Sequence, residues 1–492
     1  MIATFEEIAG ELFVSRRGGE IKPYRHVIAD SRQVLPQDTF VAIRGANVDG
    51  HRFIGDAIAA GATVIIHQEE LPEYQPGITY IRVADSARVY ARILREQCHR
   101  PDETVRLFGV TGTNGKTTTA YLIEHLLNHA GVPCGLVSTV EYRDGKRTLP
   151  ADRTTPGPDV LFPLLDEMRL NGMRAAALEL SSHALAQGRI DGARFRCAIF
   201  TNLTGDHLDY HHDMESYFQA KLQLFKQILA PDGSVVVNID DPYGMRLTRE
   251  ISGGRQLLTF GENPAAQWRL SRIELDSEGS RFRLEGENGA FDVGCNLIGL
   301  HNVRNLAGAL LAVLDFGVSP EAIDNALRDP ILVPGRLEKL TSPAGVDFFV
   351  DYAHSDDALR NVLSILRQTA RGRVIVVFGA GGDRDRSKRP RMGAAAAAGA
   401  DLLIVTSDNP RSEVPEAIID DICAGIPAGT RFERVPDRAA AIARAAELAQ
   451  PGDTVLVAGK GHENYQEIGG ESFHFSDREV IENLFGDGAL RN

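Results

Sequence analysis

Short apolar runs that each end in a polar or glycine-rich segment are the main pattern along this chain. The runs TFVAI, ATVIIH and TYIRV fall within the first 100 residues, where glycine and proline interrupt them and long helical periodicity is scarce. Apolar runs of this length, bounded by turn residues, are typical of buried strands. The pattern predicts a small α/β domain over residues 1–100, opened by a short amphipathic helix in MIATFEEIAGELF.

The next segment, residues 101–335, begins with a strand, a glycine-rich turn and a long helix. TVRLFGV leads into TGTNGKTTTAYLIEHLLNHAG, in which Tyr121, Leu122, Leu126 and Leu127 suit one helical face. The strand candidates AAALEL, CAIFTNL and SVVVNID alternate with helical stretches such as MESYFQAKLQLFKQIL, a rhythm typical of a parallel sheet. Residues 255–295 alternate at period two, which predicts an antiparallel extension.

The last segment, residues 336–492, contains four apolar strands that each run straight into a polar or glycine-rich loop. They are FFVDYAH, RVIVVFGAGGDRD, LLIVTSDNPR and TVLVAGKGHENY. Ligands of open parallel sheets bind beyond the carboxyl ends of the strands. We therefore expect these loops to converge on one ligand site, although TSDNPRSEVPE could also be only a turn followed by a helix start, with Ser412 as the N-cap and Pro415 in the first turn.

Composition and charge narrow the class of protein. With 43% hydrophobic and 24% charged residues the chain is in the ordinary globular range, and no run of about 18 apolar residues predicts a membrane span. The five cysteines are far apart and the N-terminus lacks the pattern of a secretory signal, which fits a reducing cytoplasm. A net charge of -14 argues against a nucleic-acid surface. We expect small-molecule partners, no membrane or nucleic acid, and a monomer.

The clearest chemistry lies in GVTGTNGKTTT at residues 109–119. Backbone N–H groups of such a turn can point at phosphate oxygens, Lys116 can reach the β and γ phosphates, and Thr117 can ligate Mg²⁺. The strict G-x-x-x-x-G-K-[ST] pattern is not met, because Val110 stands five residues before Gly115, so the match is to a shorter G-x-x-G-K-T form. A glycine-rich turn that binds no phosphate is the alternative.

Two clusters of carboxylates and histidines follow the next strand candidates. LELSSHALAQGRID carries Glu179 and His183, and TNLTGDHLDYHHD carries Asp206, His207 and further acidic and histidine residues. Glu179 is a natural ligand for the hard Mg²⁺ ion and His207 a less usual one. Either cluster alone could be capping and turn chemistry, but both at strand ends beside a phosphate loop favour a metal–nucleotide centre.

A series of short motifs follows along the chain in this order: TGTNGKTTT, ELSSHAL, TNLTGDHLDYH, YFQAKLQLF, GLHNVRNLAGAL, PGRLE and DYAHSDDAL. Together they resemble the motifs of the Mur ligases, which are ATP-dependent amide-bond-forming enzymes of peptidoglycan synthesis. The resemblance implies a three-domain α/β fold: a small UDP-binding domain, a central P-loop-type ATPase domain with a mostly parallel sheet, and a doubly wound, Rossmann-like C-terminal domain. The opening DSRQVLPQDTFVAIRGANVDGHRFI resembles the UDP-binding first domain of the members that add the third and later stem-peptide residues. The loop DNPRSE is similar to the one that recognises meso-diaminopimelate in the members that add it to UDP-MurNAc-L-Ala-D-Glu.

That resemblance also implies roles for individual residues. Glu179, His207, Lys116 and Lys221 would be catalytic, and Mg²⁺ would bind to Thr117 and Glu179 and to His207 and a carbamate on Lys221, formed with CO₂. Without the resemblance, Lys221 would be read as a solvated lysine on an amphipathic helix. ATP would contact Gly112, Thr113, Asn114, Gly115, Lys116, Thr117, Thr118, Asn302, Arg304, Arg336, Asp351 and His354 as the third domain closes. The UDP precursor would contact Ser31, Thr154, Thr155, Ser181, Gln187 and Arg189.

The diaminopimelate pocket implied by the resemblance comprises Arg384, Asp408, Asn409, Pro410, Arg411, Gly459 and Glu463. Arg411 could grip the distal carboxylate bidentately, while Glu463 and Asp408 accept from the ammonium. L-Lysine lacks that carboxylate and would leave Arg411 unpaired, a cost of roughly 1 to 3 kcal/mol. One departure from the family pattern is Ser355 and Asp356 after DYAH, where Thr-Pro is expected.

The alternatives are a lysine-adding ligase, a folylpolyglutamate or cyanophycin ligase of the same superfamily, and a non-catalytic ATP-binding switch. DNPRSE and the UDP-type N-terminus speak against the related ligases. A switch would need Lys116 but not the amino-acid pocket.

Overall fold

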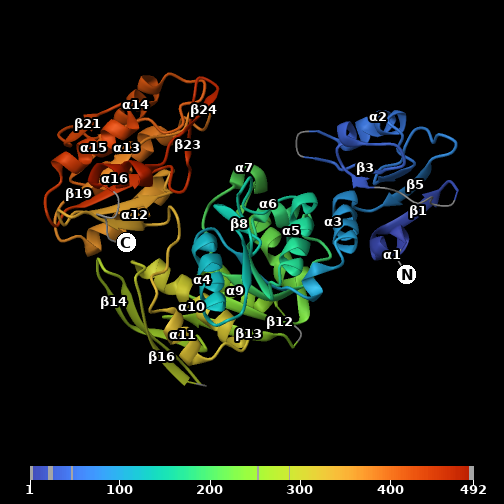
Figure 1. The fold of residues 1–492 in the computed structure, drawn as a ribbon, viewed down its shortest axis with the longest axis horizontal. Helices are drawn as coiled ribbons and strands as arrows, with labels where there is room; N and C mark the ends of the chain where they lie inside the picture. Colours follow the sequence, from blue (N-terminus) through green and yellow to red (C-terminus); the bar gives the residue numbers. More distant parts are fainter. Residues whose placement is uncertain (1–3, 20–25, 46–47, 252–253, 288, 487–492) are drawn as a thin grey trace. The chain divides into compact units, whose positions relative to one another are not determined.

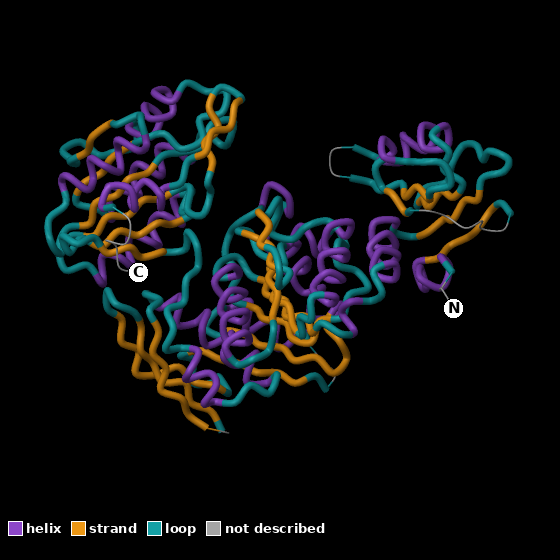
Figure 2. Tube along the Cα trace, in the orientation of Figure 1, coloured by secondary structure: helices purple, strands orange, loops and turns teal. Residues whose placement is uncertain are grey.

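The computed structural model describes residues 4–19, 26–45, 48–251, 254–287 and 289–486. Their strands form three main sheets and one small hairpin (Figures 1 and 2). The chain divides into two compact units, one of residues 1–269 with 305–323 and one of residues 270–304 with 324–492. Within the described ranges, no helix combines the length and the apolar character that a membrane crossing requires.

The N-terminal sheet has the strand order β1-β5-β4-β3-β2, in which only the β1–β5 pair is antiparallel. Its strands are β1 (Phe13–Arg17), β2 (Val27–Ile28), β3 (Thr39–Val41), β4 (Val64–His67) and β5 (Thr79–Val83). The predicted N-terminal helix is present as α1 (Phe5–Ala9), and α2 (Ile54–Ala59) and α3 (Ser86–Gln97) follow. Asp85 caps α3 by accepting from the N–H groups of Ala87 and Arg88.

The central sheet of the first unit has the order β13-β12-β11-β6-β10-β7-β8-β9, and its strands from β13 to β7 are parallel. They are β6 (Arg106–Thr111), β7 (Cys134–Val137), β8 (Glu141–Arg143), β9 (Thr148–Pro150), β10 (Ala175–Glu179), β11 (Phe195–Phe200), β12 (Leu229–Asn238) and β13 (Gln256–Gly261). The predicted antiparallel extension is right for β15 (Ser280–Gly286) and β16 (Gly289–Cys295). It is wrong for β13, which pairs parallel to both β12 and β14 (Trp268–Leu275), because a half-buried parallel strand can share the period-two pattern.

The helices of this region include the two that carry the candidate chemistry. They are α4 (Lys116–His129), α5 (Pro158–Leu170), α6 (Ser182–Ala186), α7 (Leu208–His211), α8 (Met214–Gln223), α9 (Pro242–Glu250), α10 (Leu300–Asp315) and α11 (Pro320–Ala326). The predicted helix MESYFQAKLQLFKQIL divides into α8 and a π-helical turn, η5 (Leu224–Ile228). Arg255 donates to the carbonyls of Phe225 and Leu229, which satisfies acceptors at the end of that turn.

The C-terminal sheet has the order β17-β18-β22-β19-β20-β21, and only the β17–β18 pair is antiparallel. Its strands are β17 (Glu338–Thr341), β18 (Asp347–Asp351), β19 (Val374–Phe378), β20 (Leu402–Val405), β21 (Phe432–Arg434) and β22 (Thr454–Ala458). The helices are α12 (Asp356–Thr369), α13 (Lys388–Gly399), α14 (Pro415–Cys423), α15 (Arg438–Leu448) and α16 (Asp477–Phe485), and β23 (Tyr465–Ile468) with β24 (Glu471–His474) forms a hairpin.

Alternate residues of these strands supply two separate apolar cores. In β19, Val374, Val376 and Phe378 join one core while Ile375 and Val377 join the other. Side chains of successive strand residues point to opposite faces, so a continuous apolar run requires helices on both faces. The doubly wound fold predicted for this segment follows from that requirement.

A fully buried ion pair joins two of these strand ends. The guanidinium of Arg438 contacts both carboxylate oxygens of Asp477 at 2.7 Å and also donates to the carbonyls of Ser407, at 3.3 Å, and Ala458, at 3.0 Å. Those carbonyls lie just beyond β20 and at the end of β22. Arg438 therefore ties together the loops that follow the two strands.

Replacing Arg438 by alanine should lower the free energy of unfolding of the C-terminal domain by about 3 to 5 kcal/mol, because Asp477 would remain buried without its partner. The exposed pair of Arg434 and Asp420 provides the control, since Arg434→Ala should cost less than about 1 kcal/mol. Hydrogen exchange of peptides from β20 and β22 measures both. Equal losses in the two variants would contradict the role given to Arg438.

Candidate functional site

The glycine-rich turn between β6 and α4 lies at the centre of the parallel sheet, between the ends of β10 and β11. Gly112 has a φ of 151°, and a Cβ there would lie 2.0 Å from the Oγ1 of Thr201. Gly115 has a φ of 85°, and a Cβ there would lie 2.2 Å from the Oδ1 of Asn305. Both positions therefore require glycine, for conformation and for space.

Lys116 begins α4, and its ammonium bends back over the turn. Its Nζ donates to the carbonyls of Gly112 at 3.1 Å and Thr113 at 2.7 Å. Thr117 follows, and its hydroxyl donates to the fully buried carboxylate of Glu179 at 3.1 Å. The structure thus brings together three of the predicted elements, the turn, the lysine and the acidic end of β10.

Glu179 also accepts from the backbone N–H of Thr139, at 2.8 Å, and from its hydroxyl, at 3.1 Å. A buried carboxylate beside a threonine hydroxyl is a set of oxygen donors that suits Mg²⁺. Among the residues that the structure describes, no three His, Cys, Asp or Glu side chains gather into a metal-binding group. Thr117 and Glu179 would therefore need phosphate oxygens or water to complete the coordination of an ion.

Lys221 on α8 lies beneath the same turn, and only 1% of it is exposed. Its Nζ donates to the carbonyl of Gly112 at 2.8 Å and lies 4.7 Å from the ring centroid of Tyr217. Burial lowers the pKa of Lys221 well below its ordinary value, and the charge of Lys116 lowers it further. The alternative of a solvated surface lysine is wrong, because the amphipathic pattern cannot tell which polar residue faces inward.

His207 precedes α7 and has a φ of 53°. Its ring centroid lies 4.9 Å from that of His183 and 6.1 Å from that of Tyr217, and its Nε2 is 3.5 Å from a carboxylate oxygen of Asp206. His207 and Lys221, predicted as partners at one ion, thus both lie beside Tyr217.

Tyr217 is a site residue that sequence reasoning missed. Its hydroxyl is 3.2 Å from the Oγ1 of Thr113 in the phosphate turn, and burial raises its pKa to about 12. It stands four residues before Lys221 on α8, so the two side chains share one helical face. The four-residue spacing from Lys221 was the feature of the sequence that could have identified Tyr217.

Four of the residues predicted to hold the UDP precursor, Thr155, Ser181, Gln187 and Arg189, form one hydrogen-bonded group after the end of β10. Arg189 donates to Gln187 and to the carbonyl of Thr155, and the hydroxyl of Thr155 accepts from the N–H of Ser181. Thr154 lies 3.0 Å from the hydroxyl of Thr139, the residue that contacts Glu179. The group therefore adjoins the candidate phosphate and metal residues.

A cavity of about 1920 Å³ in the first unit is lined by Gln187 and Arg189 from this group and by residues of the N-terminal sheet. Asp30 and Gln33 line it, whereas Ser31 between them is not among its described lining residues. The N-terminal residue predicted for the precursor thus lies next to the cavity rather than in its wall.

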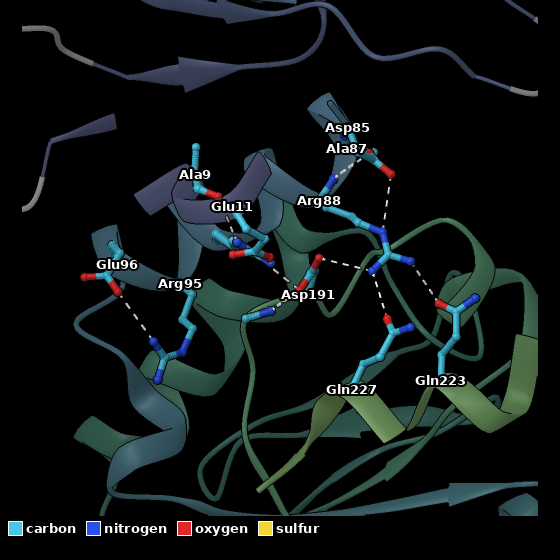
Figure 3. A network of polar contacts seen from close by, with 12 residues as sticks. Ala9, Glu11, Asp85, Ala87, Arg88, Arg95, Glu96, Asp191, Gln223 and Gln227 are labelled. Atoms are coloured by element: carbon cyan, nitrogen blue, oxygen red, sulfur yellow. Dashed lines mark hydrogen bonds and ion pairs between the residues drawn. The ribbon is translucent and has the colours of Figure 1, made fainter. Parts of the chain in front are cut away.

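Arg88 on helix α3 contacts both Asp85, which lines this cavity, and α8, the helix that carries Lys221. Figure 3 draws these contacts of Arg88. Arg88 lies 3.3 Å from Asp85 in the cavity wall and donates to Gln223 on α8 at 3.0 Å and to Gln227 on η5 at 3.2 Å. Its side chain also contacts Asp191 at 3.4 Å. Sequence reasoning missed Arg88, because an arginine on a surface helix has no distinguishing pattern.

In the second unit, Arg336 and Asp351 adjoin Tyr352. The guanidinium of Arg336 lies 5.0 Å from the ring of Tyr352, and burial raises the pKa of Asp351 although Arg336 opposes the shift. Exposed His354 lies 2.8 Å from the carbonyl of Tyr352, and Asn302 donates to the carbonyl of Ile298. Arg304 also lies on α10.

The departure at DYAH has a structural counterpart. Ser355 caps α12 by accepting from the N–H of Ala358, and Asp356 lies in the first helical turn, where a negative charge is favourable. The cap therefore fixes this turn in the absence of the expected proline.

The carboxyl ends of β18, β19, β20 and β22 lie along one edge of the sheet, as predicted. Asn409, from the loop after β20, donates to Glu463 at 3.0 Å and accepts from the buried Lys460 at 3.0 Å. Burial raises the pKa of Glu463, Lys460 opposes this, and Asp408 adds to it. A Cβ on Gly459, which has a φ of 120°, would lie 2.4 Å from a carboxylate oxygen of Asp408.

Arg411 in the same loop has a φ of 53° and a partly buried side chain. Its Nη1 donates to the carbonyl of Gly382 at 2.8 Å, and its Nε lies 2.8 Å from the carboxylate of Glu467 on β23. Pro410 precedes it, and Arg384 is exposed on the neighbouring loop.

The helix-start interpretation of this loop is only half right. Pro415 does begin α14, but Val414 is the N-cap and makes no side-chain cap hydrogen bond. The hydroxyl of Ser412 instead donates to Asp383, a residue of the loop after β19. Ser412 therefore fastens one ligand-side loop to another.

A phosphate-binding type of turn at the centre of a parallel sheet, with a buried carboxylate beside it, defines a nucleotide-dependent α/β enzyme. Models of the Mur ligase middle domain, the glutamate ligase domain of Mur ligases and the catalytic domain of the Mur ligase family match residues 110–313, 335–461 and 23–98. The chain belongs to the Mur ligase family, which are ATP-dependent ligases. The three-domain α/β fold predicted from the sequence is confirmed, while its boundaries at residues 100 and 335 stay predictions.

Similar proteins share this architecture over nearly their whole length. UDP-N-acetylmuramoyl-L-alanyl-D-glutamate–2,6-diaminopimelate ligase of Geobacter metallireducens is 40% identical over 504 residues, with 98% of each chain covered, and the ligase of the same name from Gloeobacter violaceus is 45% identical over 451 residues, covering 92% of this chain and 91% of that protein. A solved structure of such a ligase is 34% identical, covers 99% of both chains and has a TM-score of 0.71. MurF from Acinetobacter baumannii, at 19% identity and a TM-score of 0.60 with 98% and 97% coverage, shares the fold.

Replacing Lys116 by alanine should reduce phosphate release from ATP by at least about a hundredfold, because the turn would lose the ammonium that lies over its carbonyls. Among the described residues, Lys221 also contacts a carbonyl of the turn, but it is buried. Lys226→Ala is the matched control, since Lys226 is half-exposed on η5 and pairs with Glu250. It should keep nearly full activity. Substantial turnover in Lys116→Ala would refute the phosphate-turn assignment.

Proposed function

We propose that this protein adds meso-diaminopimelate to UDP-MurNAc-L-Ala-D-Glu at the expense of ATP, in peptidoglycan precursor synthesis. The observation that carries the proposal is the loop Asp408–Arg411, which presents a buried acid, an amide and an arginine at the edge of the C-terminal sheet. Relatives at 40–45% identity carry the corresponding name.

The chemistry begins with activation, because a bare carboxylate is a poor acyl donor at neutral pH. The D-Glu carboxylate attacks the γ-phosphorus of ATP, which forms an acyl phosphate and releases ADP. The free amine of diaminopimelate then attacks the acyl carbon, and phosphate leaves with the bonding electron pair as the amide forms. Lys116 and the N–H groups of the turn would neutralise the negative charge that gathers during phosphoryl transfer.

Mg²⁺ would be held by Thr117 and Glu179, and would supply further charge neutralisation at the phosphates. A second ion would need an anionic ligand where Lys221 now places an amine. The lowered pKa of Lys221 favours the neutral form of that amine, and a neutral amine can bond to CO₂ with loss of one proton, which yields a carbamate. The carbamate would turn a group that repels Mg²⁺ into a ligand beside His207.

The amino-acid pocket would read the distal end of diaminopimelate through its two charges. Arg411 would bind the carboxylate, and Glu463 and Asp408 would accept hydrogen bonds from the ammonium, with Asn409 and Gly459 shaping the loop. Arg384 is exposed at the same edge and would add a second cation. The UDP precursor would occupy the cavity lined by Gln187 and Arg189.

Phosphate release from ATP with UDP-MurNAc-L-Ala-D-Glu should occur with meso-diaminopimelate and be much slower with L-lysine or without an amino acid, and product mass should show one added diaminopimelate. Faster turnover with lysine would make the protein the lysine-adding form. Tight ATP binding with no phosphate release for any amino acid would favour the non-catalytic switch.

Incubation with ¹³C-bicarbonate should give a carbamate NMR signal that is absent from Lys221→Ala and lost on acidification, because only the unprotonated amine adds CO₂. The exposed Lys226 provides the control, since Lys226→Ala should keep the signal. A spectrum without a carbamate resonance at saturating bicarbonate and Mg²⁺ would exclude the modification.

A further inference from the structure

The guanidinium of Arg411 already has an internal anion beside it. The Oε2 of Glu467 lies 2.8 Å from its Nε, and the carbonyl of Gly382 accepts from its Nη1 at 2.8 Å. A guanidinium binds a carboxylate bidentately along the Nε–Nη2 side or the Nη1–Nη2 end. Arg411 therefore already has an anion beside its Nε and an acceptor on its Nη1 before any ligand arrives.

The backbone holds Glu467 at this place. The N–H of Arg411 donates to the carbonyl of Glu467 at 3.0 Å, and the N–H of Glu467 donates to the side-chain carbonyl of Asn409 at 3.0 Å. The N–H of Gly469 also donates to the carbonyl of Arg411 at 2.7 Å. Strand β23 thus lies along the Asp408–Arg411 loop, and these bonds keep the backbone of Glu467 beside Arg411.

Of the two acceptors on Arg411, Glu467 is the one that a ligand can displace. Gly382 is buried and donates to the carbonyl of Asn409 at 2.8 Å, and a Cβ on it would lie 1.9 Å from the carbonyl oxygen of Pro410. The carbonyl of Gly382 is therefore fixed. The side chain of Glu467 is 38% exposed and can rotate toward water.

We propose that Glu467 is a specificity-determining residue that competes with the distal carboxylate of the amino-acid substrate for Arg411. This inference rests on the proposed function and deepens it. Diaminopimelate must displace Glu467 to obtain a bidentate contact, which weakens its binding. L-Lysine has no distal carboxylate, so Arg411 keeps Glu467 as its partner and is not left unpaired.

Glu467 therefore lowers the discrimination between the two amino acids that Arg411 alone would give. The sequence predicts that L-lysine binding leaves Arg411 unpaired at a cost in free energy. That cost would apply in full only to a chain without Glu467. Two charges therefore set the specificity of the loop, that of Arg411 in the loop itself and that of Glu467 on β23.

The experiment compares kcat/KM for meso-diaminopimelate and L-lysine in the wild type, Glu467→Gln, Glu467→Ala and Glu471→Gln. Glu471 is exposed on the paired strand β24, so its variant removes a charge from the same hairpin without touching Arg411. Removal of the Glu467 charge should lower the KM for diaminopimelate and raise the diaminopimelate-to-lysine ratio about two- to fivefold, with the ATP KM unchanged. Glu467→Ala should have the larger effect, because glutamine can still accept from Nε.

A KM for diaminopimelate that rises in both Glu467 variants would overturn the proposal, and would assign Glu467 to the substrate ammonium. A ratio that does not move, or that moves equally in Glu471→Gln, would also overturn it. Failure of the proposed function is seen separately, because the wild type would then not turn over diaminopimelate at all.

Discussion

The geometry of parallel strands decides where chemistry can occur in this protein. Every strand of a parallel set ends on the same edge, and the backbone groups that leave the sheet there must find new partners. In the first unit Gly112 accepts from both Lys116 and Lys221, so one carbonyl beyond β6 collects two amines. In the second unit the carbonyls of Ser407 and Ala458 share Arg438. The residues at the strand ends are therefore chosen partly by the need to pair these backbone groups.

The sequence was most informative where local pattern and topology agree. Apolar runs followed by polar loops located the strands of the C-terminal sheet, and the placing of four loops on one edge followed from their parallel order. Lys116, Thr117 and Glu179 could be grouped for the same reason. Period-two alternation was less informative, because it assigned β13 to an antiparallel extension of the sheet although β13 pairs parallel to β12.

The sequence could not show which side chains meet across the chain. Tyr217 contacts the phosphate turn from more than 100 residues away in the sequence, at Thr113, and Ser412 bonds to Asp383 instead of capping the helix that follows it. Nothing local distinguishes Arg88 or Glu467 from ordinary surface charges. Their partners depend on the packing of whole elements, such as α3 on α8 or β23 on the loop after β20.

The two apolar cores of the C-terminal domain have a consequence for how such a protein can evolve. Strands β18, β19, β20 and β22 give their alternate side chains to different cores, while the charged residues of the loops that follow them belong to neither. Substitutions that change which amino acid is accepted can therefore accumulate in the loops and in the β23–β24 hairpin at little cost to folding. Relatives that share the scaffold can thus diverge in substrate choice through a few charged positions.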